Sequence, residues 1–170
     1  LAVVVRLTLE WLGVASADLL IRVQSDLPVA RGLGSGAAVS AALVRALALH
    51  FGRLPEPAEV SAIVYEGEKV YHGTPGGIDN SVIAWEQPIY FAKGRPPQVL
   101  GVPHPFTIVV ADSGIPSSTR EVVAGVRERR EADRRLYDTI FAEIGAISDA
   151  GRRAMQAGDW ERMGTLMHDN

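Results

Sequence analysis

Two glycine-rich turns hold the residues whose types and spacing suit phosphate chemistry. The first, PVARGLGSGAA at residues 28–38, has three glycines within five residues, directly ahead of an apolar helix. Glycine lets the backbone pass close to a ligand, and the free N–H groups in the first turn of a helix favour an anion. This turn therefore predicts a phosphate-binding loop, with a glycine-rich turn that binds no ligand as the alternative.

Two known nucleotide-binding motifs fit the first turn poorly. A Walker A loop needs Lys and then Ser or Thr after its last glycine, and this pair does not follow Gly36. Gly32, Gly34 and Ala37 do have the spacing of a dinucleotide-binding fingerprint. The context argues against it, because Pro28 interrupts the preceding strand and a second helix, not a strand, follows the first helix. We therefore reject both motifs.

The second turn, GEKVYHGTPGGIDN at residues 67–80, combines two carboxylates with a chain reversal. Glu68 lies in the last turn of a predicted helix that ends at His72. A Pro-Gly-Gly bend then folds the chain back, so that Asp79 approaches the space near Glu68. One carboxylate is suited to hold Mg²⁺ and the other to accept a substrate proton. Solvated acids or helix caps are the alternative, and His72 is interpreted as a helix-end or packing residue.

The elements that must position these turns are a mixture of helices and strands. Apolar residues at helical spacing predict three helices, at 1–12, at 37–51 and from Pro57 onward. The first should end at Gly13, and the second, which is apolar nearly all round, should be buried. Short apolar runs predict strands at 18–24, 81–85, 89–91 and 107–111. A long helix is expected from 117 or 118 through 147, and a break near Gly151 or Gly158 precedes a last helix. This mixture indicates an α+β or α/β fold.

Composition excludes several other classes of function. The chain has 170 residues, 47% hydrophobic and 22% charged, which suits one globular domain or one and a half. A net charge of −3 creates no basic field for nucleic acid or membrane, and the arginines between 127 and 135 alternate with acids, as on a self-paired solvated face. The absence of cysteine excludes disulfides and favours a cytoplasmic location. No apolar stretch is long enough to span a bilayer, and no signal-peptide pattern is present.

Three segments resemble motifs of one family. PVARGLGSGAA is similar to the phosphate-binding motif P-x-x-x-G-L-G-S-S-A-A of GHMP kinases. EKVYHGTPGGIDN closely resembles the E-x-x-x-H-G-x-P-S-G-I-D-N segment of the mevalonate kinases in that superfamily, and ADSGIPSSTREVVAGV resembles their later D-T-G-I-P-R-S-T-K-E-L-V segment. The resemblance implies ATP-dependent, Mg²⁺-assisted phosphorylation of the C5 hydroxyl of mevalonate, a step of isoprenoid biosynthesis within lipid metabolism.

The resemblance also implies roles for single residues. Asp79 would act as the catalytic base toward the C5 hydroxyl, and Thr119 would lie near the reacting groups. Glu68, joined by Ser35, would coordinate Mg²⁺. Alignment and charge neutralisation supply most of the acceleration in such a transfer. The residues implied to surround the ATP phosphates are Pro28, Gly32, Leu33, Gly34, Ser35, Gly36 and Ala37.

Three residues depart from the family motifs. Gly36 replaces a serine whose hydroxyl is a usual Mg²⁺ ligand, so Ser35, water or another acid must compensate. Gly76 replaces the serine of P-S-G, and Ser117 replaces a basic residue. The family's lysine-bearing segment would precede Leu1 and its G-A-G-G-G loop would follow Asn170. We therefore expect this chain alone not to be a competent enzyme.

The implied fold is α+β and GHMP-kinase-like, with two domains. Residues 1–103 would belong to a ribosomal S5-like N-terminal domain, and residues 104–170 would begin the C-terminal α/β domain. Mevalonate and ATP are the expected partners, without nucleic acid or membrane, and a homodimer is left open. The rivals are a sister GHMP kinase for a sugar or homoserine and a non-catalytic relative that binds a ligand or partner. Gly36 favours the latter, whereas Glu68 and Asp79 argue against it.

Overall fold

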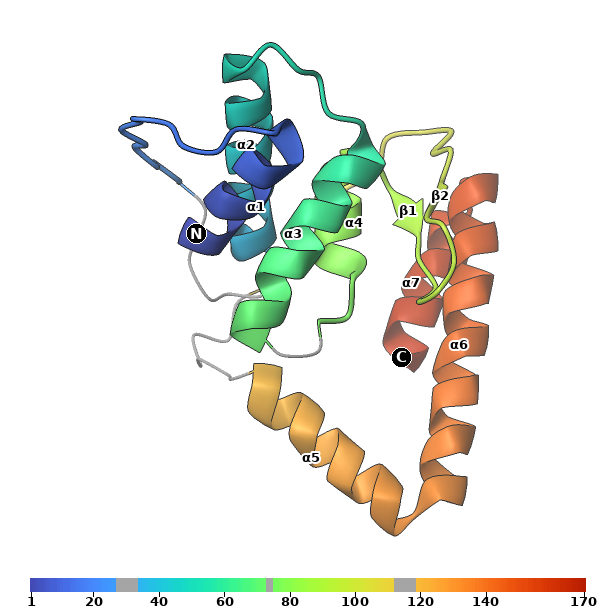
Figure 1. Ribbon diagram of the computed structural model, residues 1–170. Coiled ribbons are helices and arrows are strands. Elements are labelled where there is room, and N and C mark those ends of the chain that lie inside the picture. The colour runs from blue at the N-terminus through green and yellow to red at the C-terminus, as the bar shows by residue number, and fades with distance from the viewer. Residues whose placement is uncertain (27–33, 73–74, 112–118) are drawn as a thin grey trace. The chain divides into compact units, whose positions relative to one another are not determined.

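The computed structural model describes residues 1–26, 34–72, 75–111 and 119–170, except for the side chains at 71, 72, 119 and 120. These residues form helices joined by loops and one small sheet (Figure 1). The contacts within the chain group these residues into two compact units, Leu1–Pro97 and Gln98–Asn170. The helices are α1 (Ala2–Leu12), α2 (Ser35–His50), α3 (Pro57–His72), α4 (Ile78–Trp85), α5 (Thr119–Ala132), α6 (Arg134–Ala157) and α7 (Trp160–Asp169), and the two strands of the sheet are β1 (Ile89–Tyr90) and β2 (Gln98–Val99).

The helices of the first unit begin and end where local chemistry predicts. Gly13 adopts a left-handed conformation at φ 73° and ends α1, with its N–H donating to the Glu10 carbonyl at 3.0 Å. Pro57 begins α3, and the Glu59 carboxylate accepts the Glu56 N–H at 2.9 Å just ahead of it. The predicted helices at 1–12, 37–51 and from Pro57 to His72 are confirmed.

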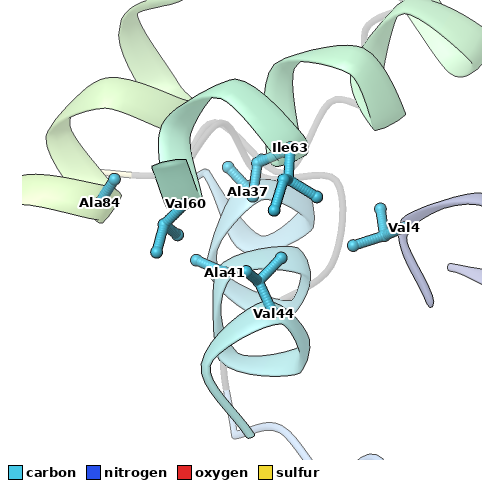
Figure 2. Close-up of a cluster of buried hydrophobic side chains, with 8 residues drawn as sticks. Val4, Ala37, Ala41, Val44, Val60, Ile63 and Ala84 are labelled. Atoms are coloured by element: carbon cyan, nitrogen blue, oxygen red, sulfur yellow. The ribbon is translucent and has the colours of Figure 1, made fainter. Parts of the chain in front are cut away.

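Helices α1 to α4 share one apolar core, drawn in Figure 2. From α2, Ala37, Ala41 and Val44 recur at the spacing of one helix face, and their small size lets α3 and α4 approach closely. The buried members of the core are Val4, Ala37, Ala41, Val44, Val60, Ile63, Val64 and Ala84.

One expectation for α2 is wrong, because the helix is not buried all round. Ala42, Ala46 and Leu49 are exposed. Residues 21–25 run beside this side of the helix and leave a groove of about 330 Å³ between them. The apolar residues of α2 therefore form two faces. One packs in the core, and the described residues cover the other only in part.

Three predicted strands are also wrong. Residues 81–85 lie in α4, because Gly77 starts a helix there and because Asn80, Ser81 and Ala84 are buried at helical spacing. Residues 18–24 and 107–111 form no regular structure, and Leu20 and Val109 are 93% and 88% exposed. A strand needs a partner for its backbone N–H and C=O groups, and the described residues pair neither segment. The strand predicted at 89–91 is confirmed as β1.

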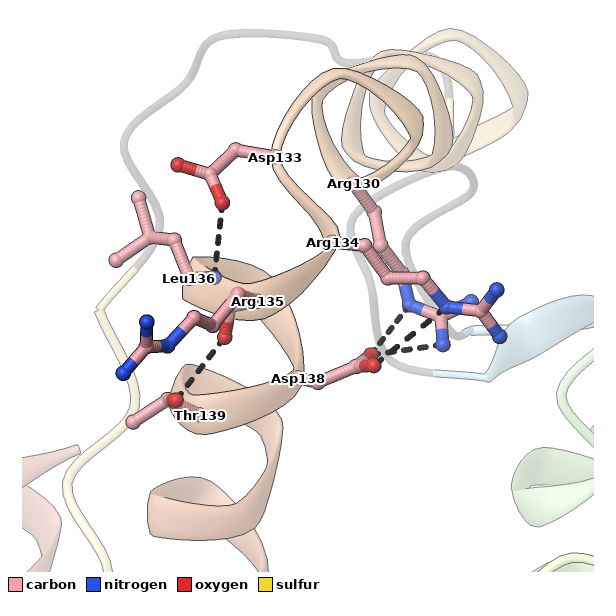
Figure 3. A network of polar contacts seen from close by, with 7 residues as sticks. All are labelled: Arg130, Asp133, Arg134, Arg135, Leu136, Asp138 and Thr139. Carbon is pink, nitrogen blue, oxygen red and sulfur yellow. Dashed lines mark hydrogen bonds and ion pairs between the residues drawn. The ribbon is translucent and has the colours of Figure 1, made fainter.

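In the second unit, the long helix predicted through residue 147 is two helices, α5 and α6. Asp133 separates them, since its carboxylate accepts the Leu136 N–H at 3.0 Å and caps α6 (Figure 3). Arg130 and Arg134 both point to Asp138, at 2.7 and 3.7 Å. The charged stretch is therefore mostly exposed, as predicted for a solvated face, but these two arginines pair with Asp138, which lies beyond it.

The predicted break before the last helix occurs at Gly158, in the left-handed conformation at φ 68°. Asp159 then caps α7 by accepting the Arg162 N–H at 3.0 Å. Phe106 stacks on Trp160 with ring centroids 4.4 Å apart, so residues near 106 lie against the start of α7. None of the described helices is both long enough and apolar enough to cross a membrane.

Candidate functional site

The end of the first glycine-rich turn lies among the described residues. Gly34 has φ 65° and precedes α2 as its N-cap, and its carbonyl accepts the Ala38 N–H at 2.9 Å. A left-handed N-cap is strained for any residue with a side chain. Gly34 also brings no side-chain acceptor to the first N–H groups of α2, which are the groups that bind anions at helix starts. The predicted site residues Pro28, Gly32 and Leu33 lie outside the described residues.

The first turn of α2 is anchored on one side and open on the other. Ala37 is 2% exposed and belongs to the core, whereas Gly36 is exposed. A Cβ added at Gly36 would meet no described heavy atom within 4 Å. Packing against the described residues therefore does not require glycine there, and a serine would fit.

Glu68 is partly buried on α3, one turn before the helix ends at His72 as predicted. The residue before it, Gly67, is buried, and a Cβ there would lie 2.6 Å from Val4 Cγ2 of α1. Helix α1 thus meets the backbone of α3 directly beside Glu68. The predicted role of Glu68 in metal binding stays a prediction.

Asp79 occupies the first turn of α4 and is exposed. The bend before it is fixed by Gly77, which has φ 95° and whose added Cβ would lie 3.1 Å from Phe91 Cζ and 3.6 Å from Tyr65 Cε2. The chain reversal therefore leads into a helix, not a strand, and sets the carboxylate at a helix N-terminus, where the macrodipole favours negative charge. The approach of Asp79 to Glu68 stays a prediction.

A buried polar cluster, which the sequence analysis missed, ties α4 to α3. Asn80 Nδ2 donates to the Ser61 carbonyl at 3.2 Å and to Ser61 Oγ at 2.8 Å. Ser81 Oγ lies 3.5 Å from Ser61 Oγ and donates to the Gly77 carbonyl at 2.7 Å. Ser61, Asn80 and Ser81 are 8%, 4% and 4% exposed. Their signal in the sequence was the presence of small polar residues at helical positions that face the core.

Arg45 makes a second tie to α4, and it too was missed. Its Nη2 donates to the Ala84 carbonyl at 2.8 Å and lies 3.0 Å from Glu86 Oε1. Arg45 thereby satisfies a carbonyl in the last turn of α4. A single charged residue within the apolar run of α2 was the signal, because a half-buried guanidinium requires acceptors.

The described residues contain no group of three or more His, Asp or Glu side chains able to enclose a metal. Mg²⁺ is commonly held by one or two protein oxygens together with substrate phosphates, so Glu68 and Ser35 suit it as hard oxygen donors. Lys69, beside Glu68 in the chain, pairs with Glu66 at 2.6 Å. The hydrogen bond that the Lys69 ammonium donates to the Glu66 carboxylate raises the pKa of Lys69 above its ordinary 10.5.

Thr119 is the first residue of α5 and belongs to the second unit. Its side chain lies outside the described residues, so its predicted role near the reacting groups stays a prediction.

Comparison with known proteins identifies the class. Residues 2–86 match the family described as GHMP kinases N terminal domain. The chain is 34% identical over 155 residues to a mevalonate kinase of Thermococcus sibiricus, covering 88% of this chain and 46% of the relative. It is 32% identical over 141 residues to one of Mus musculus, covering 74% and 35%, and 29% identical over 171 residues to one of Pyrococcus furiosus, covering 98% and 51%. No solved structure matches the chain.

The chain therefore belongs to the GHMP kinase family. It spans about half, or less, of the length of the curated relatives it matches, and these relatives are mevalonate kinases.

Proposed function

We propose that the full-length protein is a mevalonate kinase that transfers the γ-phosphate of ATP to the C5 hydroxyl of mevalonate, in the cytoplasm and within isoprenoid biosynthesis. The observation that carries this proposal is the match to mevalonate kinases over as much as 98% of the chain. The second glycine-rich turn supports it, since Glu68 and Asp79 flank a bend held by Gly77. In the proposed enzyme, residues 1–103 belong to the N-terminal domain and residues 104–170 begin the C-terminal domain.

The proposed transfer assigns one step to each site residue. As the C5 oxygen forms its bond to the γ-phosphorus, the bond from that phosphorus to the β–γ bridging oxygen breaks and ADP leaves. Asp79 orients the hydroxyl and accepts its proton. The exposure of Asp79 in the first turn of α4 leaves its carboxylate accessible to a substrate. Thr119 is proposed to lie near the reacting groups.

The residues proposed to hold ATP are those of the first turn. Its described part consists of the left-handed Gly34 and the first residues of α2. Bound Mg²⁺ would neutralise charge on the β- and γ-phosphates. Glu68 and Ser35 are the proposed protein ligands, and Gly36 leaves room for a water in place of a hydroxyl ligand.

The test is Asp79→Asn in the full-length protein. The amide keeps the shape and one acceptor oxygen but loses the charge, so kcat with mevalonate should fall by at least ~10²-fold, the lower end for acid–base groups. ATP binding should change little, because Asp79 is assigned to the acceptor. Asp159→Asn is the matched control: it changes another aspartate at a helix start, and asparagine caps helices as well as aspartate does.

Three results would contradict the proposal. A near-normal kcat for Asp79→Asn would remove the assigned base. Loss of activity together with a lowered melting temperature would make Asp79 structural. Phosphorylation of a sugar or homoserine, but not of mevalonate, would assign the protein to a sister kinase.

A further inference from the structure

We propose that Asn80 is a positioning residue, whose buried amide fixes the first turn of α4 on α3 and thereby aims the neighbouring Asp79 carboxylate at its substrate. This inference rests on the proposed function, because it takes Asp79 as the group that accepts the proton.

Asn80 lies next to Asp79 in the first turn of α4, so its contacts fix the same end of the helix. The Asn80 amide donates to both the carbonyl and the hydroxyl of Ser61, at 3.2 and 2.8 Å, across 19 residues of sequence. The Ser81 hydroxyl closes the same turn onto the Gly77 carbonyl at 2.7 Å. The two residues that follow Asp79, Asn80 and Ser81, are thus buried and fixed to α3 and to the bend, while Asp79 itself is exposed.

The amide of Asn80 is not optimised for stability. Its Oδ1 is buried and accepts no hydrogen bond from the described residues. A buried acceptor without a donor costs free energy, and an apolar side chain of similar shape would avoid that cost. What the amide adds is direction, because its two bonds to one residue allow a single register of α4 on α3.

The same register relates Asp79 to Glu68. Ser61 and Glu68 are seven residues apart on α3, which puts them on the same face, two turns or about 10 Å apart along the axis. Asn80 therefore anchors α4 to the face of α3 that carries the proposed metal ligand. A shift of α4 along that face would change the distance between the proposed base and the proposed metal ligand.

The other end of α4 provides the control. Arg45 ties the Ala84 carbonyl and Glu86 to α2, at 2.8 and 3.0 Å. Ala84 lies five residues beyond Asp79, or roughly 7–8 Å along the helix. Loss of either tie should lower the melting temperature, but only loss of the Asn80 tie should disturb Asp79 directly.

The experiment compares Asn80→Ala, Ser61→Ala and Arg45→Ala in the full-length protein, each with and without Asp79→Asn. For each, kcat with mevalonate, KM for ATP and the melting temperature are measured. We expect Asn80→Ala to lower kcat at least ~10-fold, within the ~10²-fold that a misplacement of about 1 Å can cost, with an unchanged KM for ATP. Ser61→Ala, the milder change, should lower kcat in the same direction, and Arg45→Ala should lower the melting temperature with kcat retained.

The double variant separates positioning from general destabilisation. If Asn80 acts through Asp79, adding Asn80→Ala to Asp79→Asn should cause little further loss of kcat. Equal losses in both backgrounds, or an equal loss of kcat in Arg45→Ala, would overturn the proposal. A normal kcat in both Asn80→Ala and Ser61→Ala would overturn it while leaving Asp79 as the base. A normal kcat in Asp79→Asn would overturn both the base assignment and this inference.

Discussion

Replacement of Gly67 by alanine should destabilise the protein, although alanine is the best helix former and Gly67 lies inside α3. The added Cβ would lie 2.6 Å from Val4 Cγ2, well inside van der Waals contact. Val4 is 1% exposed and β-branched, so its side chain has no alternative position to take. The close approach of α1 to α3 therefore depends on the missing side chain at Gly67.

The size of the effect follows from two opposing contributions. Alanine gains about 1 kcal/mol in helix propensity over glycine, and overpacking a core costs about 1–3 kcal/mol. The short contact and the rigid neighbour favour the upper half of that range, so the net loss should be about 1–2 kcal/mol. Gly145→Ala, inside α6 with no described heavy atom within 4 Å of its added Cβ, should instead gain up to about 1 kcal/mol.

The assay is urea denaturation of the full-length protein, followed by circular dichroism, for Gly67→Ala, Gly145→Ala, Val4→Ala and the double variant at 4 and 67. Val4→Ala removes the two methyl groups at the contact, so the double variant should be more stable than the sum of the single changes by about 1 kcal/mol or more. If Gly67→Ala were as stable as Gly145→Ala, the packing of α1 against α3 described above would be refuted.

Three further predictions concern the candidate site and the start of α3. Gly34→Val should weaken ATP binding, whereas the control Gly52→Val, which puts the same side chain at another left-handed glycine (φ 74°), should not. If calorimetry gave the two variants the same ATP affinity, the assignment of Gly34 to the phosphate site would be contradicted. Glu68→Gln should raise the Mg²⁺ concentration needed for half-maximal activity, and a shift just as large in the control Glu66→Gln would contradict Glu68 as a ligand. The pKa of the Glu59 carboxyl lies below its ordinary 4.5, mainly because the Glu56 N–H donates a hydrogen bond to it and then because Arg53 lies beside it. The ionised Glu59 carboxylate therefore stabilises the fold above pH 4.5, and this stabilisation is lost as the pH falls through the folded pKa. The stability difference between the wild type and Glu59→Gln, measured by urea denaturation from pH 7 to 3, should therefore shrink on acidification, and a constant difference would contradict this linkage.

Local signals in the sequence predicted the helices well. Gly13, Pro57 and Gly158 mark ends or starts because left-handed glycines and proline act within one turn of the chain. The same kind of local signal was overlooked at Asp133, whose carboxylate caps α6 and divides the predicted long helix. For the site, the sequence motifs pointed to the GHMP family that the comparisons show.

The sequence by itself determined the family and the boundaries of α1 and α3, because short motifs and helix-end signals depend on residues close in the chain. Only the tertiary structure decided that residues 81–85 form a helix, that Gly67 must lack a side chain, and that Asn80 and Arg45 clamp α4. Each of these depends on a partner from another helix, and Arg45 and Ala84 are 39 residues apart. A short apolar run suits a helix or a strand equally well. Which of the two forms depends on the neighbouring elements that pack against its side chains and hydrogen-bond to its polar groups.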